Sequence, residues 1–245
     1  MPAPVDQQRP DHSAWLHQAR ATWDERAPWW DEVAQVYAAA PDRVGDIHRT
    51  ATALNLQPGS RLLDAGCGTG QFAIAFARRG CDVTAVDLAP DMLKRARRHA
   101  QEAGVEIIWR EGDLTALPDR DETYDAVHAR LSLHFVPDMA ATLTELRRVL
   151  RPGGRLYASI PGALSPIYAN VWQRHLDPGR RANNYATPWE LACLLEHQGW
   201  AIVDQWGDFG PTPDGAPNSL RGEAIPTLDI RLQQAAATTW AFIAE

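Results

Sequence analysis

A glycine-rich segment at residues 64–70, with the sequence DAGCGTG, constrains the fold of this chain more than any other stretch. Apolar residues precede it at Leu62 and Leu63, and an amphipathic run follows at 71–79, which predicts a strand, a sharp turn and a helix in that order. Alternate glycines lack a Cβ atom, so the backbone can bend tightly and approach a ligand closely. We therefore expect this turn to hold a ligand.

Strand and helix patterns alternate five times from residue 60 onward. The predicted strands of this region are 61–65, 82–86, 105–110, 124–129 and 155–160. Such alternation is typical of a parallel sheet with helices on both faces and a ligand crevice beyond the carboxyl ends of the strands. It predicts an α/β fold with a doubly wound sheet, and two later strands are expected at 200–205 and 238–244.

The chain divides into three parts by composition. Residues 1–11 are rich in proline and polar side chains and are expected to form a disordered tail. Residues 12–56 are predicted to form N-terminal cap helices, with a break at Pro28. The main domain is expected at 57–245, with a lid insertion after the fifth strand at about 163–187.

The composition of the chain limits the classes of molecule that it is expected to bind. The 245 residues suffice for one well-buried α/β domain, and the net charge of −7 argues against binding to nucleic acid or anionic lipid. No apolar run approaches the roughly 18 residues of a membrane span, and no signal segment is evident, so a cytoplasmic location is expected. The three cysteines lack C-x-x-C spacing, so no metal site is predicted. We expect a small-molecule substrate and a monomer or homodimer.

Binding sites for two classes of nucleotide-like ligand have a glycine turn after the first strand and an acid after the second. Both classes of ligand contain a ribose, which a carboxylate can hold. A dinucleotide site needs G-x-G-x-x-G, which brings a helix N-terminus against a pyrophosphate. Here the glycines are Gly66, Gly68 and Gly70, and Asp64 precedes them. A carboxylate at that place would repel a pyrophosphate and suits an ammonium group, so an NAD-dependent oxidoreductase is disfavoured.

Residues 63–70 resemble the first motif of class I S-adenosylmethionine-dependent methyltransferases. Further segments are similar to later motifs of that family, in the same order along the chain: 86–93, 112–114, 124–127 and 146–154. The pattern W-D-x-x-A-x-x-W-D at 23–31 also resembles the N-terminal helix of the small-molecule branch related to ubiquinone and menaquinone methylation. The resemblance implies a Rossmann-like, mostly parallel seven-stranded sheet.

The activity that this resemblance implies is transfer of a methyl group from S-adenosylmethionine to an oxygen, nitrogen or carbon of a small organic acceptor, with S-adenosylhomocysteine as product. The alternative is a catalytically inactive S-adenosylmethionine-binding protein that acts as a sensor or partner. In the family, the first acid and the amides of the glycine turn hold the methionine moiety, and the acid after the second strand accepts the ribose hydroxyls. The residues that carry these roles over, together with those placed beside the nucleoside, the adenine edge and the methionine tail, are Asp64, Ala65, Gly66, Cys67, Gly68, Gly70, Asp87, Leu88, Met92, Asp113, Leu114 and Arg130.

Chemistry supports the role of Asp87 independently, because a carboxylate only accepts hydrogen bonds and can take two hydroxyl donors at once. Asp113 has a plainer alternative as the cap of the following turn, and Arg130 as a surface arginine.

Two histidines flank the end of the fourth predicted strand, His128 and His134. Histidine titrates near neutral pH, so His134 is a candidate base for deprotonating the acceptor. For both residues a packed or hydrogen-bonded histidine is the stronger interpretation from sequence. Large aromatic side chains supply flat apolar surfaces. The candidates for an acceptor pocket, with ordinary packing as the alternative, are Trp29, Trp30, Tyr168, Trp172 and Tyr185.

Overall fold

The structure is a computed structural model that describes residues 11–38, 41–165, 168, 183–209, 225 and 228–245. Within this part of the chain, seven strands form one sheet in the order β3-β2-β1-β4-β5-β7-β6. Their bounds are β1 (Arg61–Ala65), β2 (Asp82–Asp87), β3 (Ile108–Glu111), β4 (Tyr124–Arg130), β5 (Leu150–Pro161), β6 (Ile202–Asp208) and β7 (Thr239–Ala244). Strands β1 to β5 pair in parallel, and β7 pairs antiparallel with β5 and β6. The predicted fold class is confirmed.

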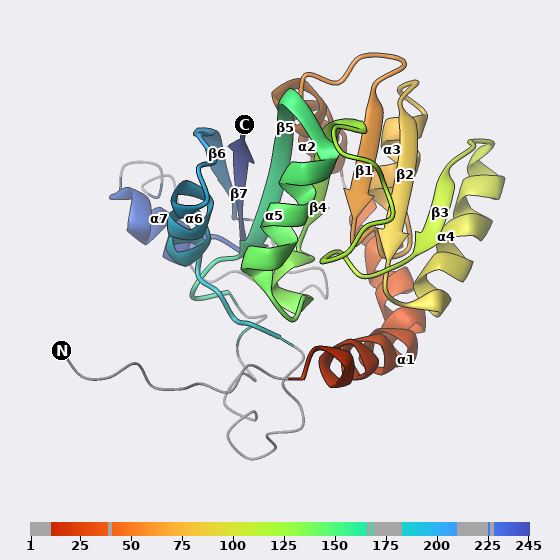
Figure 1. The fold of residues 1–245 in the computed structure, drawn as a ribbon, viewed down its shortest axis with the longest axis horizontal. Helices are drawn as coiled ribbons and strands as arrows, with labels where there is room; N and C mark the ends of the chain where they lie inside the picture. Colours follow the sequence, from red (N-terminus) through yellow and green to blue (C-terminus); the bar gives the residue numbers. More distant parts are fainter. Residues whose placement is uncertain (1–10, 39–40, 166–167, 169–182, 210–224, 226–227) are drawn as a thin grey trace.

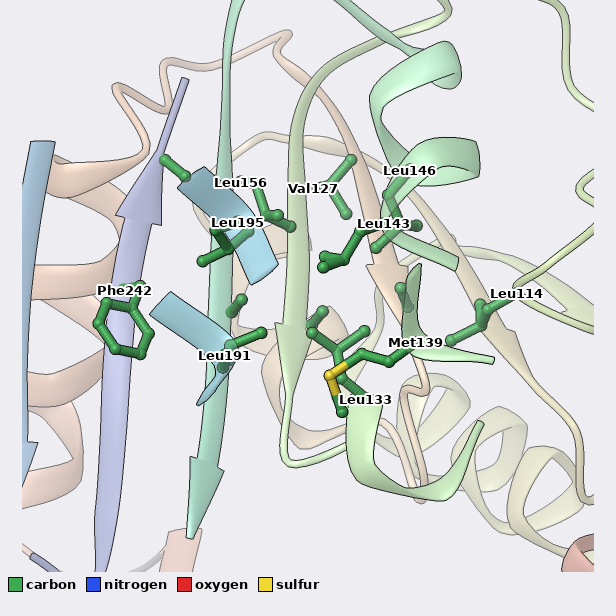
Figure 2. Packing of buried hydrophobic residues seen from close by; sticks show 14 of the residues in the cluster. Leu114, Val127, Leu133, Met139, Leu143, Leu146, Leu156, Leu191, Leu195 and Phe242 are labelled. Atoms are coloured by element: carbon green, nitrogen blue, oxygen red, sulfur yellow. The ribbon is translucent and has the colours of Figure 1, made fainter. Parts of the chain in front are cut away.

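Helices cover both faces of this sheet (Figure 1). Their bounds are α1 (His12–Ala38), α2 (Pro41–Ala53), α3 (Gln71–Ala77), α4 (Pro90–Ala103), α5 (Met139–Val149), α6 (Pro188–His197) and α7 (Ile230–Ala236), with one 3-10 turn, η1 (Leu133–Phe135). On one face, α5 and α6 pack against β4 and β5 in a large apolar core. Figure 2 shows part of it, with Leu143 and Leu146 of α5 near Val127 of β4. On the other face, α2 and α3 pack over β1, β2 and β4.

Helix α1 runs without interruption through Pro28, so the predicted break there is wrong. Ala27, the residue before the proline, is fully buried and packs with Ala89 and Met92 at the start of α4. Tertiary packing therefore holds this part of α1 helical, although proline removes one hydrogen bond of the helix.

Several element boundaries also differ from the prediction, including the start of β5, which lies at Leu150 and not at residue 155. Strand β3 begins at Ile108, because the amide of Val105 bonds to the carbonyl of Ala100 and closes the end of α4. Strand β6 continues to Asp208, where it still pairs with Thr239 of β7. Helix α7 was not expected. The predicted tail, apart from residue 11, and most of the predicted lid lie outside the described residues.

Candidate active site

A cavity lies at the carboxyl ends of β1, β2 and β4. Strands β1 and β4 are neighbours at the point where the strand order of the sheet reverses, which is where α/β sheets of this kind bind ligands. Helix α1, at the lower right of Figure 1, passes along these strand ends and contributes one wall of the cavity. The predicted site residues that line the cavity are Trp29, Trp30, Asp64, Gly66, Cys67, Gly68, Asp87, Leu88, Met92, Asp113, Leu114, Arg130 and His134. Residues far apart in sequence are thus brought to one place.

The turn after β1 is shaped by close packing at its glycines. A Cβ atom on Gly66, whose φ is +80°, would lie 2.3 Å from Cβ of Ser132. The amides of Gly66 and Cys67 both donate to the carbonyl of Val86, at 2.8 and 3.0 Å. These two amides are therefore engaged within the protein, and the predicted contact of amides around Gly66 with the methionine moiety stays a prediction.

Two predicted residues of this turn serve packing instead of lining the cavity. Ala65 is fully buried, and its carbonyl accepts a hydrogen bond from the Ser132 hydroxyl at 2.7 Å. At Gly70, with φ of +88°, a Cβ atom would lie 2.7 Å from the Trp109 ring. The third glycine thus lets α3 begin close to β3 and α4.

Asp64, at the carboxyl end of β1, presents a buried carboxylate to the cavity. Its Oδ1 atom accepts a hydrogen bond from Nδ1 of His128 at 2.9 Å. Its Oδ2 atom is buried and has no hydrogen-bond partner among the described residues. An unsatisfied buried oxygen of this kind is energetically unfavourable, so the site favours a ligand that brings a donor, above all a cationic one.

Asp87, at the end of β2, is held by backbone amides on both sides. Its Oδ2 atom accepts from Gly68 at 2.8 Å, and Oδ1 accepts from Ala89 at 2.9 Å. Burial raises the pKa of this carboxyl to about 6, and the two amides partly offset the shift. Each oxygen keeps a further lone pair, so the carboxylate can still accept hydroxyl donors of a ligand.

Asp113, after β3, is engaged by its neighbours. Its Oδ1 accepts from the amide of Thr115 at 2.9 Å, and its Oδ2 from the hydroxyl of Thr115 at 2.6 Å. Nε2 of His12, at the start of α1, lies 2.7 Å from Oδ2. Asp113 therefore caps a turn and contacts α1, while its proposed contact with adenine remains a prediction.

Helix α1 closes the cavity with tryptophans. The indole of Trp15 donates to the carbonyl of Phe135 at 2.9 Å, and the ring of Trp23 packs edge-on against Phe135 at 4.8 Å. Nε1 of Trp30 would lie 3.2 Å from a Cβ atom on Gly68. Trp30 thus reaches the glycine turn itself.

Several lining residues were not singled out by the sequence. They are Leu16, Ala19, Trp23, Arg26, Ala34, Ile47, Gln71, Phe72, Gly112, Leu131, Ser132, Phe135, Val136 and Pro137. His128, which the sequence did single out, also lines the cavity. Trp23 stood within the N-terminal pattern that resembled a methyltransferase helix, and that pattern was the available signal. Phe135 carried none, because its position depends on the turn after β4.

His134 lies in η1 and is almost completely buried. Its Nδ1 atom has no hydrogen-bond partner among the described residues. Burial lowers the pKa of the imidazole to about 3, so the ring is neutral at physiological pH. Arg130 is the last residue of β4, and its guanidinium lies 4.9 Å from the centre of the Phe72 ring.

The other predicted pocket aromatics lie away from the main cavity or outside the described residues. Tyr185 lines a second depression with Asn184 and Glu190. The ring of Tyr168 packs edge-on against the ring of Tyr185, with 5.6 Å between their centres. The amide of Asn184 donates to the carbonyl of His134 at 2.7 Å, which ties this segment to the cavity wall. Trp172 lies outside the described residues.

Comparison with solved structures defines the class of fold. The chain superposes on an S-adenosylmethionine-dependent methyltransferase from Mesorhizobium loti with a TM-score of 0.60 and 21% identity, over 84% of this chain and 98% of that chain. The [4+2]-cyclase SpnF gives a TM-score of 0.62 and 23% identity, over 83% of this chain and 79% of that chain. At these identities the likeness concerns the fold alone, which is that of a class I methyltransferase.

Sequence comparison defines the family. Residues 63–158 match the family model described as methyltransferase domain. A ubiquinone biosynthesis O-methyltransferase of Xylella fastidiosa (strain 9a5c) is 33% identical over 190 residues, covering 73% of this chain and 76% of the relative. One of Xanthomonas axonopodis pv. citri (strain 306) is 33% identical over 191 residues, covering 73% and 78%. The chain therefore belongs to the S-adenosylmethionine-dependent methyltransferase family, as its motifs predicted.

The described residues also bear on membrane insertion and metal binding. None of the described helices combines the length and apolar character that crossing a membrane requires. The described residues also contain no group of three or more His, Cys, Asp or Glu side chains placed to hold a metal ion.

Proposed function

We propose that this chain transfers a methyl group from S-adenosylmethionine to a hydroxyl oxygen of a small aromatic acceptor. The observation that carries this proposal is one cavity in which the unpartnered Oδ2 of Asp64 and the amide-held carboxylate of Asp87 lie at adjacent strand ends. The choice of oxygen is supported by relatives at 33% identity whose names specify O-methyl transfer. The aromatic class is supported by the tryptophans of α1 along the cavity.

The residues present fit the cofactor. Asp64 would accept hydrogen bonds from the ammonium group of the cofactor, because a buried anionic oxygen without a donor favours a cation. Asp87 would accept the two ribose hydroxyls, and the apolar side chains of Leu88, Met92 and Leu114 would pack against the nucleoside. When bound, S-adenosylmethionine supplies an electrophilic methyl group on a positively charged sulfur. The chain mainly has to position the acceptor and exclude water.

The walls of the cavity would hold the acceptor. Trp23, Trp29, Trp30 and Phe135 line it, and flat rings of this kind pack well against an aromatic acceptor. His134 would accept the hydroxyl proton at a ring nitrogen, because burial keeps the imidazole neutral. The same burial makes it a weak base, so its contribution belongs at the low end of the roughly 10²–10⁴-fold range for general bases.

The predicted roles of Tyr168, Trp172 and Tyr185 in acceptor binding stay proposals. We also propose a cytoplasmic location and a monomer or homodimer. The absence of a nucleic-acid partner is supported by the net charge of −7.

The experiment is methyl transfer with S-adenosylmethionine labelled in its methyl group. The purified chain is incubated with a panel of catechols and simple phenols, and with matched aromatic amines as acceptors of a different nucleophile. Labelled methyl ether from a phenolic acceptor is the expected product. Label in the amines alone would contradict the choice of oxygen. S-adenosylhomocysteine binding without labelled product from any acceptor or from a metabolite extract would favour a sensor.

A further inference from the structure

Asp64 and His128 are partners across two neighbouring parallel strands. They pair in the register of β1 with β4, which puts their side chains next to each other. Nδ1 of His128 lies 2.9 Å from Oδ1 of Asp64, and the two side chains are 1% and 3% exposed. A carboxylate can only accept hydrogen bonds, so Nδ1 of His128 carries the proton and donates it.

Aromatic rings hold the imidazole of His128 in place. The ring of Phe72, just inside α3, stacks on it at 4.9 Å, and the ring of Tyr157 stacks on it at 4.8 Å. Tyr157 is the next register partner along the sheet, on β5. Phe76 adds an edge-on contact at 5.3 Å. These contacts oppose tilting of the imidazole, and the hydrogen bond to Asp64 favours the orientation that turns Nδ1 toward the carboxylate.

Each side chain of the pair has a second polar atom besides the one in the shared hydrogen bond. Nε2 of His128 is buried and has no hydrogen-bond partner among the described residues. The hydrogen bond from His128 occupies only Oδ1 of Asp64, so Oδ2 stays available to a ligand.

We propose that His128 is a positioning residue, which fixes the carboxylate of Asp64 so that Oδ2 receives the ammonium group of the cofactor's amino-acid portion. This inference rests on the proposed function. It assigns His128 no contact with the reacting atoms and no role in binding the adenosine portion. Loss of the Nδ1 donor should therefore weaken only ligands that carry the amino acid.

The test compares two ligands and two variants by titration calorimetry. S-adenosylhomocysteine carries the amino-acid portion, whereas 5′-methylthioadenosine has the same nucleoside and sulfur without it. In His128→Leu the donor is removed and apolar bulk is kept. In His128→Asn the donor is retained, because the side-chain nitrogen of asparagine occupies the place of Nδ1.

His128→Leu is expected to weaken S-adenosylhomocysteine about 10- to 100-fold, as for a hydrogen bond to a charged group, and to leave 5′-methylthioadenosine within about twofold. His128→Asn should recover most of the loss. An equal loss for both ligands would show a merely structural role, and unchanged S-adenosylhomocysteine binding in His128→Leu would equally overturn the inference. Failure of the unmutated chain to bind S-adenosylhomocysteine would instead contradict the proposed function, and this inference with it.

Discussion

Asp31 of α1 forms an ion pair with Arg95 of α4 at 3.1 Å, and the Asp31 side chain is only 5% exposed. Arg98 reaches the same carboxylate oxygen at 3.2 Å. About two turns earlier on α1, Oδ1 of Asp24 accepts a hydrogen bond from the amide of Asp91 at the start of α4. Helix α1 is thereby fastened to α4, the helix that follows Asp87, and it stays over the cavity.

Asp31→Ala should therefore destabilise the protein. Removing a buried carboxylate that is hydrogen-bonded to two arginines is expected to lower the free energy of unfolding by about 2 kcal/mol. For a chain of this size that corresponds to a fall in Tm of about 4–8 °C. Thermal unfolding followed by circular dichroism measures it. The neighbouring exposed Glu32 provides the control, since Glu32→Ala should leave Tm nearly unchanged. Equal shifts in the two variants would contradict the role of Asp31.

Gly66→Ala and Gly59→Ala form a matched pair. Both glycines have positive φ, +80° and +83°, but a Cβ on Gly66 would meet Ser132 at 2.3 Å, whereas nothing lies within 4 Å at Gly59. Gly59→Ala should lower the free energy of unfolding by about 1–2 kcal/mol through backbone strain alone. Gly66→Ala should lower it by about 3 kcal/mol or more, because overpacking adds to that strain. Urea unfolding measures both, and similar losses would show that the close approach at Gly66 is unimportant.

Cofactor binding should weaken in mild acid. Burial raises the pKa of Asp87 to about 6 in the ligand-free protein. The ionised carboxylate accepts two hydroxyls, whereas protonation turns one oxygen into a donor, so binding favours the ionised form. As pH falls through 6 the protonated fraction grows, and at pH 5 the affinity for S-adenosylhomocysteine should be about tenfold lower than at pH 8. Calorimetry across this range measures the slope. Asp87→Asn should bind weakly and lack it, and a flat profile for the unmutated chain would refute the assignment.

His134→Gln tests the proposed proton acceptor. With a base of pKa about 3, turnover at pH 7.5 should fall by about 10²-fold, the low end for general-base catalysis. The affinity for S-adenosylhomocysteine should stay unchanged. Because that pKa lies far below neutrality, His134 should contribute no ionisation to the pH profile of kcat between pH 5 and 9. Steady-state kinetics of methyl transfer to a phenolic acceptor provides both readouts, and unchanged turnover in the variant would exclude His134 as base.

The sequence predicted the parallel sheet and the rim of the site because those features are local. The spacing of glycines, the acid after β2 and the alternation of strand and helix each follow from a few consecutive residues. The sequence did not indicate that Ser132 packs on Gly66 or that Trp23 contacts Phe135. Those contacts depend on how the turn after β4 and the path of α1 are placed, and neither leaves a periodic signal.

The pairing of Asp64 with His128 shows the same limit. Each residue stood near the end of a predicted strand, but their contact requires β4 to be the neighbour of β1. In chain order β2 and β3 lie between these two strands. Local patterns specify strands, whereas the order of strands is decided by packing across the whole sheet. The uninterrupted helix through Pro28 is a further case in which tertiary packing prevails over a local signal.

The most direct test of the cavity as an S-adenosylmethionine site is titration calorimetry. S-adenosylhomocysteine and NAD are each titrated into the purified chain, and S-adenosylhomocysteine is also titrated into the Asp87→Ala variant. We expect S-adenosylhomocysteine to bind, NAD to give no heat, and Asp87→Ala to weaken S-adenosylhomocysteine by at least tenfold through loss of the hydroxyl acceptor. Binding of NAD alone, or undiminished affinity in Asp87→Ala, would contradict the assignment.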